Sequence, residues 1–63
     1  MFYWIIQVYK GNVSAIGPYK TESACRNRYD RIQGGEIHEF RSESESASEA
    51  IDEFKVEMAR GAV

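Results

Sequence analysis

The sequence has few of the residues that usually hold small proteins together. It contains one cysteine, Cys25, and one histidine, His38. A single thiol cannot form an internal disulfide, and one histidine without a cysteine cluster offers no ligand set for a structural zinc ion. A chain of 63 residues hides only about 60% of its unfolded surface when it folds. We therefore expect one small globular domain, residues 1–63, with no metal or other cofactor, stabilised by strong local propensity or by a partner chain.

Long apolar runs are also missing. The apolar start, MFYWIIQV, lacks the preceding basic residues of a signal peptide and ends in a turn. No stretch approaches the roughly 18 consecutive apolar residues that a membrane-spanning helix needs. A hydrophobic content of 43% is typical of a folded globular chain rather than a disordered one. We expect a soluble, cytoplasmic protein with no membrane partner.

The small net charge of −2 conceals an uneven distribution along the chain. Residues 1–33 carry five basic and two acidic side chains, whereas residues 34–63 carry three basic and eight acidic ones. Such charge runs usually form solvated helix faces. They are also compatible with a dipolar surface that pairs head to tail with another copy or meets a charged partner.

The first predicted strand is apolar on both faces, although a half-buried strand should alternate. Within FYWIIQVY, residues 2–9, one face holds Phe2, Trp4, Ile6 and Val8, and the other holds Tyr3, Ile5, Gln7 and Tyr9. Gly11-Asn12 predicts a two-residue hairpin loop, because both residues tolerate positive φ. This loop would pair Val8 with Ala15 in the second strand.

Turn and capping signals delimit the second strand and the two helices. Pro18 should end the second strand, since proline cannot donate to a strand ladder. Thr21 is the expected N-cap of a first helix that Gly34-Gly35 stops. The apolar stripe of this helix is Cys25, Tyr29 and Ile32. A second helix over about 46–60 would begin with a capping box formed by Ser46 and Glu49. Its expected buried residues are Ala47, Ala50, Ile51, Phe54, Met58 and Ala59.

A third strand is predicted at EIHEFR, residues 36–41, with Ile37 and Glu39 on one face and His38 and Phe40 on the other. The alternation does not show which of these faces points inward. The helix before this strand is a crossover, so the second and third strands should flank the first, each antiparallel to it. The predicted fold is α+β, in the order ββαβα: a three-stranded antiparallel sheet of order 2-1-3 with both helices on one face.

No pattern in the sequence is typical of an enzyme active site. Cys25 could act as a nucleophile near the basic side chains of its helix, and His38 could act as a general base beside a glutamate. A buried core cysteine and a half-exposed strand histidine account for both residues more simply. The serine run at residues 42–48 is typical of a loop and helix caps. We expect a non-enzymatic protein without catalytic residues, and a small enzyme using His38 or Cys25 is the least favoured alternative.

Two helices on one face would leave the opposite face of the sheet uncovered. We expect this surface to be the interaction site, and its residues are Tyr3, Ile5, Gln7, Tyr9 and Ile16. Soluble monomers seldom expose such a patch, and a second copy would add the burial that a small core lacks. The predicted function is a small protein-interaction module that self-associates as a homodimer. The competing interpretation is a face that is only modestly apolar, because Gln7 and Ser14 interrupt it.

Two tyrosines on this face give a second candidate function. Aromatic side chains on a sheet can stack with the bases of single-stranded nucleic acid, so Tyr3 and Tyr9 could form a binding platform. Only Lys10, Lys20 and Arg41 could flank them. A pI near 5.3 gives none of the basic footprint of nucleic-acid-binding proteins. Nucleic acid is therefore a less favoured partner than a second copy of the chain.

Overall fold

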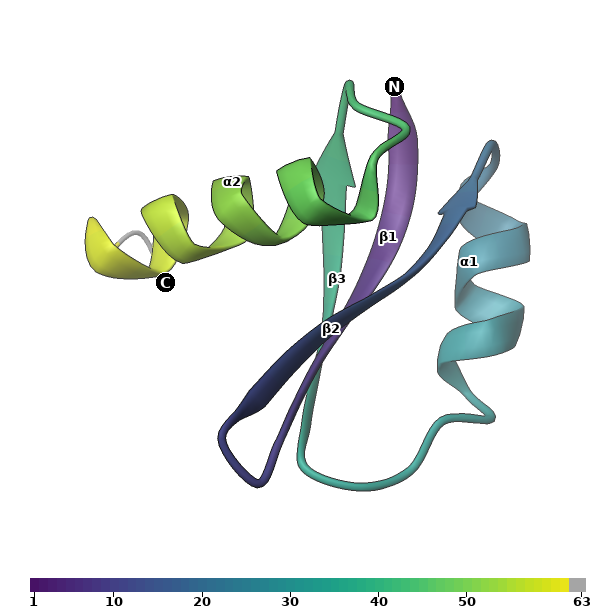
Figure 1. Ribbon diagram of the computed structural model, residues 1–63. Helices are drawn as coiled ribbons and strands as arrows, with labels where there is room; N and C mark the ends of the chain where they lie inside the picture. Colours follow the sequence, from purple (N-terminus) through teal and green to yellow (C-terminus); the bar gives the residue numbers. More distant parts are fainter. Residues whose placement is uncertain (62–63) are drawn as a thin grey trace.

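A three-stranded sheet forms the centre of the molecule (Figure 1). The computed structural model describes residues 1–61. The strands are β1 (Phe2–Tyr9), β2 (Asn12–Tyr19) and β3 (Glu36–Ser42), and the helices are α1 (Glu22–Tyr29) and α2 (Ala47–Ala59). β1 is antiparallel to both of its neighbours, so the sheet order is β2-β1-β3. The predicted α+β class, order of elements and sheet order are confirmed.

The β1–β2 hairpin turns one residue earlier than the predicted loop, Gly11-Asn12. Its two-residue loop is Lys10-Gly11, where φ is 51° and 80°. Glycine thus occupies the second loop position, as it does in the Asn-Gly loops that favour this turn. Val8 pairs with Val13 rather than with Ala15. The register differs from the prediction by two residues, and therefore each side chain keeps its predicted face.

β2 continues through Pro18 to Tyr19, so the predicted end of this strand is wrong. The strand lies at the edge of the sheet, where a residue without an N–H group is tolerated. Its pairing with β1 is irregular between Tyr3 and Ile5, because β2 contains one residue more than β1 over this stretch. The β2 edge is therefore interrupted by a bulge and a proline.

α2 covers the face of the sheet that carries Trp4 and Ile6. These two side chains form a buried core with Ala50 and Phe54 of the helix, and the half-buried side chains packed around them are Phe2, Val8, Val13, Ala15 and Phe40. The chain contains no leucine, so aromatic and β-branched side chains supply most of the core volume. The indole N–H of Trp4 donates to the carbonyl oxygen of Ser44 at 3.2 Å, which ties the segment before α2 to the core.

The orientation of β3, which the sequence left open, follows from its contacts with α2. The rings of His38 and Phe40 lie 5.2 and 5.7 Å from the ring of Phe54, measured between centroids. Both side chains therefore face α2, and Ile37 and Glu39 face the other side of the sheet.

α1 lies against this other side, which corrects the prediction that both helices share one face. Arg26 of α1 forms an ion pair with Glu39, at 3.0 Å. Glu39 lies opposite Ile5 in the β1–β3 register, so α1 covers the Ile5 face. Ile5 and Cys25 are 0% and 1% exposed. β1 is apolar on both faces because each face is covered by a helix of the same chain.

The helix ends agree only partly with the predicted capping signals. Thr21 is the N-cap of α1, where its hydroxyl oxygen accepts a hydrogen bond from the Ala24 N–H at 3.2 Å, as predicted. α1 ends at Tyr29, earlier than the predicted stop at Gly34-Gly35. Gly35 has a different function: its φ is 69°, and a Cβ at this position would overlap the carbonyl oxygen of Val8. Position 35 therefore has no room for a side chain, because the backbone there passes close to β1.

At α2 the expected capping box does not form. Ser46 is the N-cap, but its side chain makes no capping hydrogen bond. The hydroxyl of Ser44 accepts from the Ser46 N–H at 3.0 Å and donates to the Glu49 carboxylate at 2.6 Å. A serine two residues earlier in the SESES run thus stabilises the start of the helix.

The C-terminal half of α2 projects beyond the sheet. In Figure 1 the helix crosses the sheet and extends past β3 into solvent. Every residue from Lys55 to Gly61 is exposed. Of the predicted buried stripe, Ala50 and Phe54 are buried, Ile51 is half-buried, and Ala47, Met58 and Ala59 are exposed. Met58 and Ala59 are exposed because no strand within residues 1–61 lies beneath the last turns of the helix.

Candidate functional site

The five predicted interface residues do not form an open surface. Ile5 is completely buried beneath α1, and Tyr3, Gln7 and Ile16 are half-buried. Tyr9 alone among the five is exposed, at 48%. The face that we expected to be uncovered is occupied by α1 and by the segment that follows it.

Two of these side chains already have partners within the chain. The side-chain amide of Gln7 donates to the carbonyl oxygens of Gln33 and Gly34, at 3.2 and 2.9 Å. The Nζ atom of Lys10 lies 5.3 Å from the centre of the Tyr9 ring, within the range of a cation–π contact. Tyr3 is half-buried and Tyr9 contacts Lys10, so the two rings do not form one exposed aromatic surface.

His38 is half-buried beside the core. Its ring lies against Phe54, and its Nε2 atom is buried without a hydrogen-bond partner in the described part of the chain. A general base needs access to a substrate proton and a group that orients it. The position of His38 gives it contact with an apolar ring instead.

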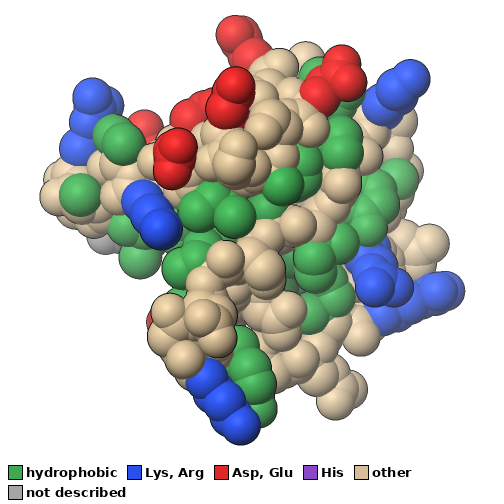
Figure 2. All heavy atoms as spheres, viewed as in Figure 1, with side chains coloured by type: hydrophobic (Ala, Val, Ile, Leu, Met, Phe, Trp, Pro, Cys, Tyr) green, Lys and Arg blue, Asp and Glu red, His purple; other side chains and the backbone are tan. Residues whose placement is uncertain are grey.

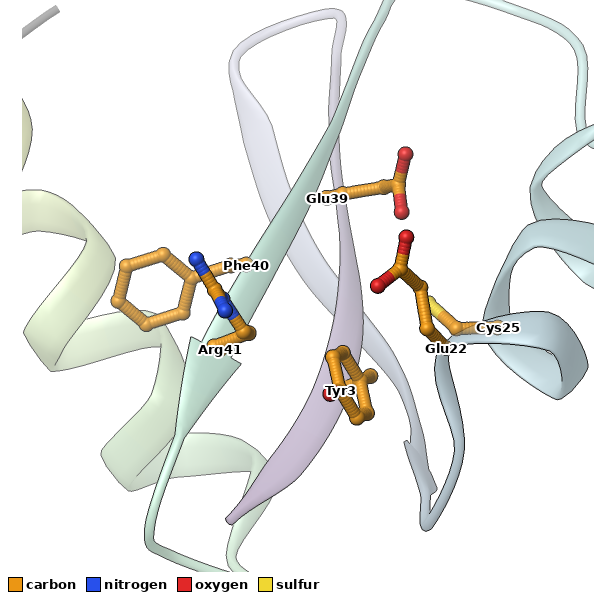
Figure 3. Close-up of a pocket in the computed structure, with 6 residues that line it drawn as sticks. All are labelled: Tyr3, Glu22, Cys25, Glu39, Phe40 and Arg41. Atoms are coloured by element: carbon orange, nitrogen blue, oxygen red, sulfur yellow. The ribbon is translucent and has the colours of Figure 1, made fainter.

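Cys25 lies at a small hollow of about 270 Å³ on the α1 side of the sheet. The residues that line it are Tyr3, Glu22, Cys25, Glu39, Phe40 and Arg41 (Figure 3). Figure 3 shows the carboxylates of Glu22 and Glu39 turned toward each other beside the thiol. Burial raises the pKa of the Cys25 thiol; Glu39 raises it further, Arg26 partly offsets this and Glu22 adds to it. The thiol is therefore held in its protonated form, which is a poor nucleophile.

The β3 strand has one edge paired with β1 and one open edge. Tyr9 and Asn12 flank the two-residue loop and therefore form a hydrogen-bonded pair. Because backbone groups alternate in direction along a strand, the N–H and C=O groups of the even-numbered β1 residues point toward β3. Trp4 pairs with Phe40, so the even-numbered β3 residues point back toward β1.

The N–H and C=O groups of the odd-numbered β3 residues therefore point away from β1, toward the open edge. These residues are Ile37, Glu39 and Arg41. One contact supports this direction: the hydroxyl of Tyr29 donates to the carbonyl oxygen of Ile37 at 3.2 Å. Farther along the strand, the backbone groups of Glu39 and Arg41 have no strand beside them within residues 1–61. These two residues form the open part of the edge.

The open edge and the projecting half of α2 enclose a groove of about 680 Å³. β3 contributes Glu39, Phe40 and Arg41, and α2 contributes Asp52, Glu53, Val56, Glu57 and Arg60. Val56 is 50% exposed and Phe40 is half-buried. Unpaired backbone donors and acceptors thus lie beside apolar side chains, an arrangement that suits an added strand.

Figure 2 shows how charge is distributed on the α2 face of the molecule. Acidic side chains gather over α2 and the segment before it, while most Lys and Arg side chains lie near the outline of the molecule. Hydrophobic side chains run between α2 and the sheet and reach the projecting end of the helix. On the α2 side the groove has three carboxylates, Asp52, Glu53 and Glu57, and one guanidinium group, Arg60, so it is acidic beside the apolar Phe40 and Val56.

The sequence contained part of the signal for this edge. The predicted sheet order already placed the third strand at an edge, and Glu39, Phe40 and Arg41 follow one another as an acid, an aromatic and a base. The projection of α2 past the strand could not be predicted, because it depends on the angle at which the helix crosses the sheet.

Comparisons with known proteins do not assign the chain to a family. No protein-family model, curated protein or solved structure matches it. Within residues 1–61, no group of three or more His, Cys, Asp or Glu side chains is arranged to hold a metal ion. No helix in that part of the chain is long and apolar enough to cross a membrane. The candidate site therefore rests on the geometry of β3 and α2.

Proposed function

We propose that this chain is a small non-enzymatic protein-interaction module that binds an extended segment of a protein partner along β3, beneath α2. The observation that carries the proposal is the open edge at Glu39 and Arg41, roofed by the projecting half of a helix. Strand addition of this kind obtains affinity from main-chain hydrogen bonds and specificity from side chains beside the edge.

The groove indicates which segment would fit. An apolar side chain facing α2 would contact Phe40 and Val56, which line the groove. On the opposite face of the added strand, charged side chains would meet Glu39 and Arg41, which are both exposed. The expected partner strand is therefore amphipathic, apolar on one face and charged on the other.

The β3 edge suits this role better than the β2 edge. β2 is interrupted by Pro18 and by its bulge, two features that protect sheet edges from added strands. β3 pairs with β1 in an unbroken register from Glu36 to Ser42 and contains no proline. An added strand could follow it without a change in register.

The two alternative functions have less support from the geometry. Nucleic-acid binding would need stacking rings, but Tyr3 is half-buried beside α1 and Tyr9 already contacts Lys10. An enzymatic function would need an accessible nucleophile or base, but Cys25 is 1% exposed, and the half-buried His38 packs against Phe54 with its Nε2 atom buried.

A peptide with the β3 sequence, capped at both ends and comprising residues 36–42, tests the proposed function. We expect its addition to ¹⁵N-labelled protein to shift the backbone resonances of Glu39 and Arg41 and those of α2 around Val56. A peptide of the same composition in scrambled order is the control. Shifts that are absent, or that are confined to β2, would contradict the proposal.

Two variants at one position separate backbone pairing from side-chain contacts. Arg41→Pro removes an N–H group that faces the open edge and is not used in the β1–β3 ladder, so the fold should persist while peptide binding is lost. Arg41→Ala keeps this N–H group and should retain most of the binding. Equal binding by Arg41→Pro and the wild type would show that β3 does not accept a strand.

A further inference from the structure

We infer that the strand that fits this groove is β3 of a second copy, paired antiparallel across a two-fold axis at Phe40. This inference rests on the proposed function, because it names the partner for the same edge. A two-fold interface brings a surface against itself, so the edge must complement its own charges and hydrogen-bonding groups. β3 meets this requirement in one register.

The hydrogen-bonding groups restrict the possible registers. Glu39 and Arg41 both point outward, so either can join a hydrogen-bonded pair with an outward-pointing residue of another strand. With the axis at Phe40, Glu39 of each copy lies opposite Arg41 of the other, and both pairs are satisfied. With the axis at Glu39, Arg41 would instead lie opposite Ile37, whose carbonyl oxygen already accepts from the Tyr29 hydroxyl.

Charge selects the same register. Side chains directly opposite each other on adjacent strands have Cβ atoms about 4.5–5.5 Å apart, so like charges there are unfavourable. An axis at Glu39 would oppose two glutamates, and an axis at Arg41 would oppose two arginines. The axis at Phe40 creates two Glu39–Arg41 pairs related by symmetry. Each glutamate also keeps its partner Arg26, which lies 3.0 Å away in the same chain.

The position of the projecting half of α2 is compatible with the same dimer. A two-fold axis perpendicular to the sheet leaves both α2 helices on one face, and each helix projects across the edge where the partner's β3 would lie. Val56, half exposed in the single chain, would then face a strand, and the two Phe40 rings would lie beside each other on the axis. The surface that α2 leaves unsupported in one copy would be filled by the other.

The acidic character of α2 opposes this association. Asp52, Glu53 and Glu57 line the groove on each copy, and only Arg60 of the same helix balances them there. The Glu53 carboxylate accepts a hydrogen bond from the Ser42 hydroxyl at 2.9 Å, which fixes one of these charges within its own chain. We therefore expect a dimer of modest affinity that dissociates on dilution.

A mixing experiment with two charge variants tests the register. Arg41→Glu places only carboxylates on the open edge, and Glu39→Lys places only cations there. Each variant alone should dissociate at a concentration about tenfold or more above that of the wild type, because both cross-strand pairs become repulsive. An equimolar mixture should restore the wild-type dimer by sedimentation velocity, since each copy then opposes acid with base.

Circular dichroism should show that both variants are folded, since Glu39 and Arg41 are exposed. A mixture that remains monomeric while the wild type dimerises would overturn the register. A wild type that stays monomeric at several hundred micromolar would overturn the dimer altogether. If the wild type is monomeric but binds the β3 peptide, the proposed function is still supported. A monomeric wild type that does not bind the peptide would contradict both the dimer and the proposed function.

Amide hydrogen exchange of the wild type provides a check that needs no variant. The N–H groups of Glu39 and Arg41 should exchange more slowly as protein concentration rises, because dimerisation brings them into hydrogen bonds. The outward N–H groups of Val13 and Ala15 on the opposite edge are the internal control and should not change. Concentration-independent exchange at Glu39 and Arg41 would contradict the inference.

Discussion

Adjacent residues of β1 belong to different layers of the molecule. Trp4 is 2% exposed and packs in the core beneath α2, whereas Ile5 is 0% exposed and lies beneath α1. The twofold periodicity of a strand sends these neighbouring side chains to opposite faces. The sequence alone is enough to sort them in this way. It does not say whether the second face meets a helix, a partner or solvent, since an apolar face is compatible with each.

Trp4→Ala tests the core at this scale. Truncation of a large buried aromatic side chain costs about 3–5 kcal/mol, comparable with the whole stability of so small a domain. The change also removes the hydrogen bond from the indole to Ser44. We expect Trp4→Ala to be unfolded by NMR, with poor dispersion of its amide resonances. Tyr9→Ala, at a position 48% exposed, is the control and should remain folded. A well-dispersed spectrum from Trp4→Ala would contradict the core assignment.

At the scale of elements, local signals predicted the start of both helices and the end of α2, but they did not predict the end of α1. Thr21 caps α1 as predicted, because an N-cap acts through hydrogen bonds within a few residues. The end of α1 depends instead on where the chain must turn to enter β3, and Gly35 serves that passage beside Val8. For α2, Ser46 is the N-cap as predicted, but the hydroxyl that bonds to Glu49 belongs to Ser44, because the SESES run offers several serines at similar spacing.

A pair of cap variants distinguishes the two helix starts. Thr21→Ala removes a hydrogen bond to the Ala24 N–H and should destabilise the protein by about 1 kcal/mol. For a domain of this size, that corresponds to a fall in Tm of about 5 °C. Ser46→Ala removes a side chain that makes no capping bond and should change the Tm much less. Thermal unfolding followed by circular dichroism measures both, and an equal effect of the two changes would refute the assigned caps.

At the scale of the whole molecule, the order of the strands was predictable and the distribution of the helices was not. The crossover between β2 and β3 and the apolar character of β1 together lead to the order β2-β1-β3. Both helices were expected on the Trp4 face, but the 13-residue α2 covers the core there with Ala50 and Phe54. α1 instead packs on the Ile5 face, on the opposite side of the sheet. The candidate interaction surface consequently lies at the sheet edge, where a helix longer than the sheet is wide leaves a groove.

This arrangement predicts opposite outcomes for lysine at two apolar positions. Ile5→Lys would place an ammonium group between the sheet and α1, at a position that is 0% exposed, and the nearest acid, Glu39, already pairs with Arg26. The cost should exceed the roughly 3–5 kcal/mol that a single small core supplies, and the variant should not fold. Val56→Lys alters a residue that is 50% exposed on the projecting half of α2, so the fold should persist. Its dimer should dissociate at a higher concentration than that of the wild type, because Val56 would no longer cover the partner's strand.

Circular dichroism and sedimentation of the two variants measure these effects. A folded Ile5→Lys would refute the burial of Ile5 beneath α1, and a wild-type dimer affinity in Val56→Lys would exclude the projecting helix from the interface.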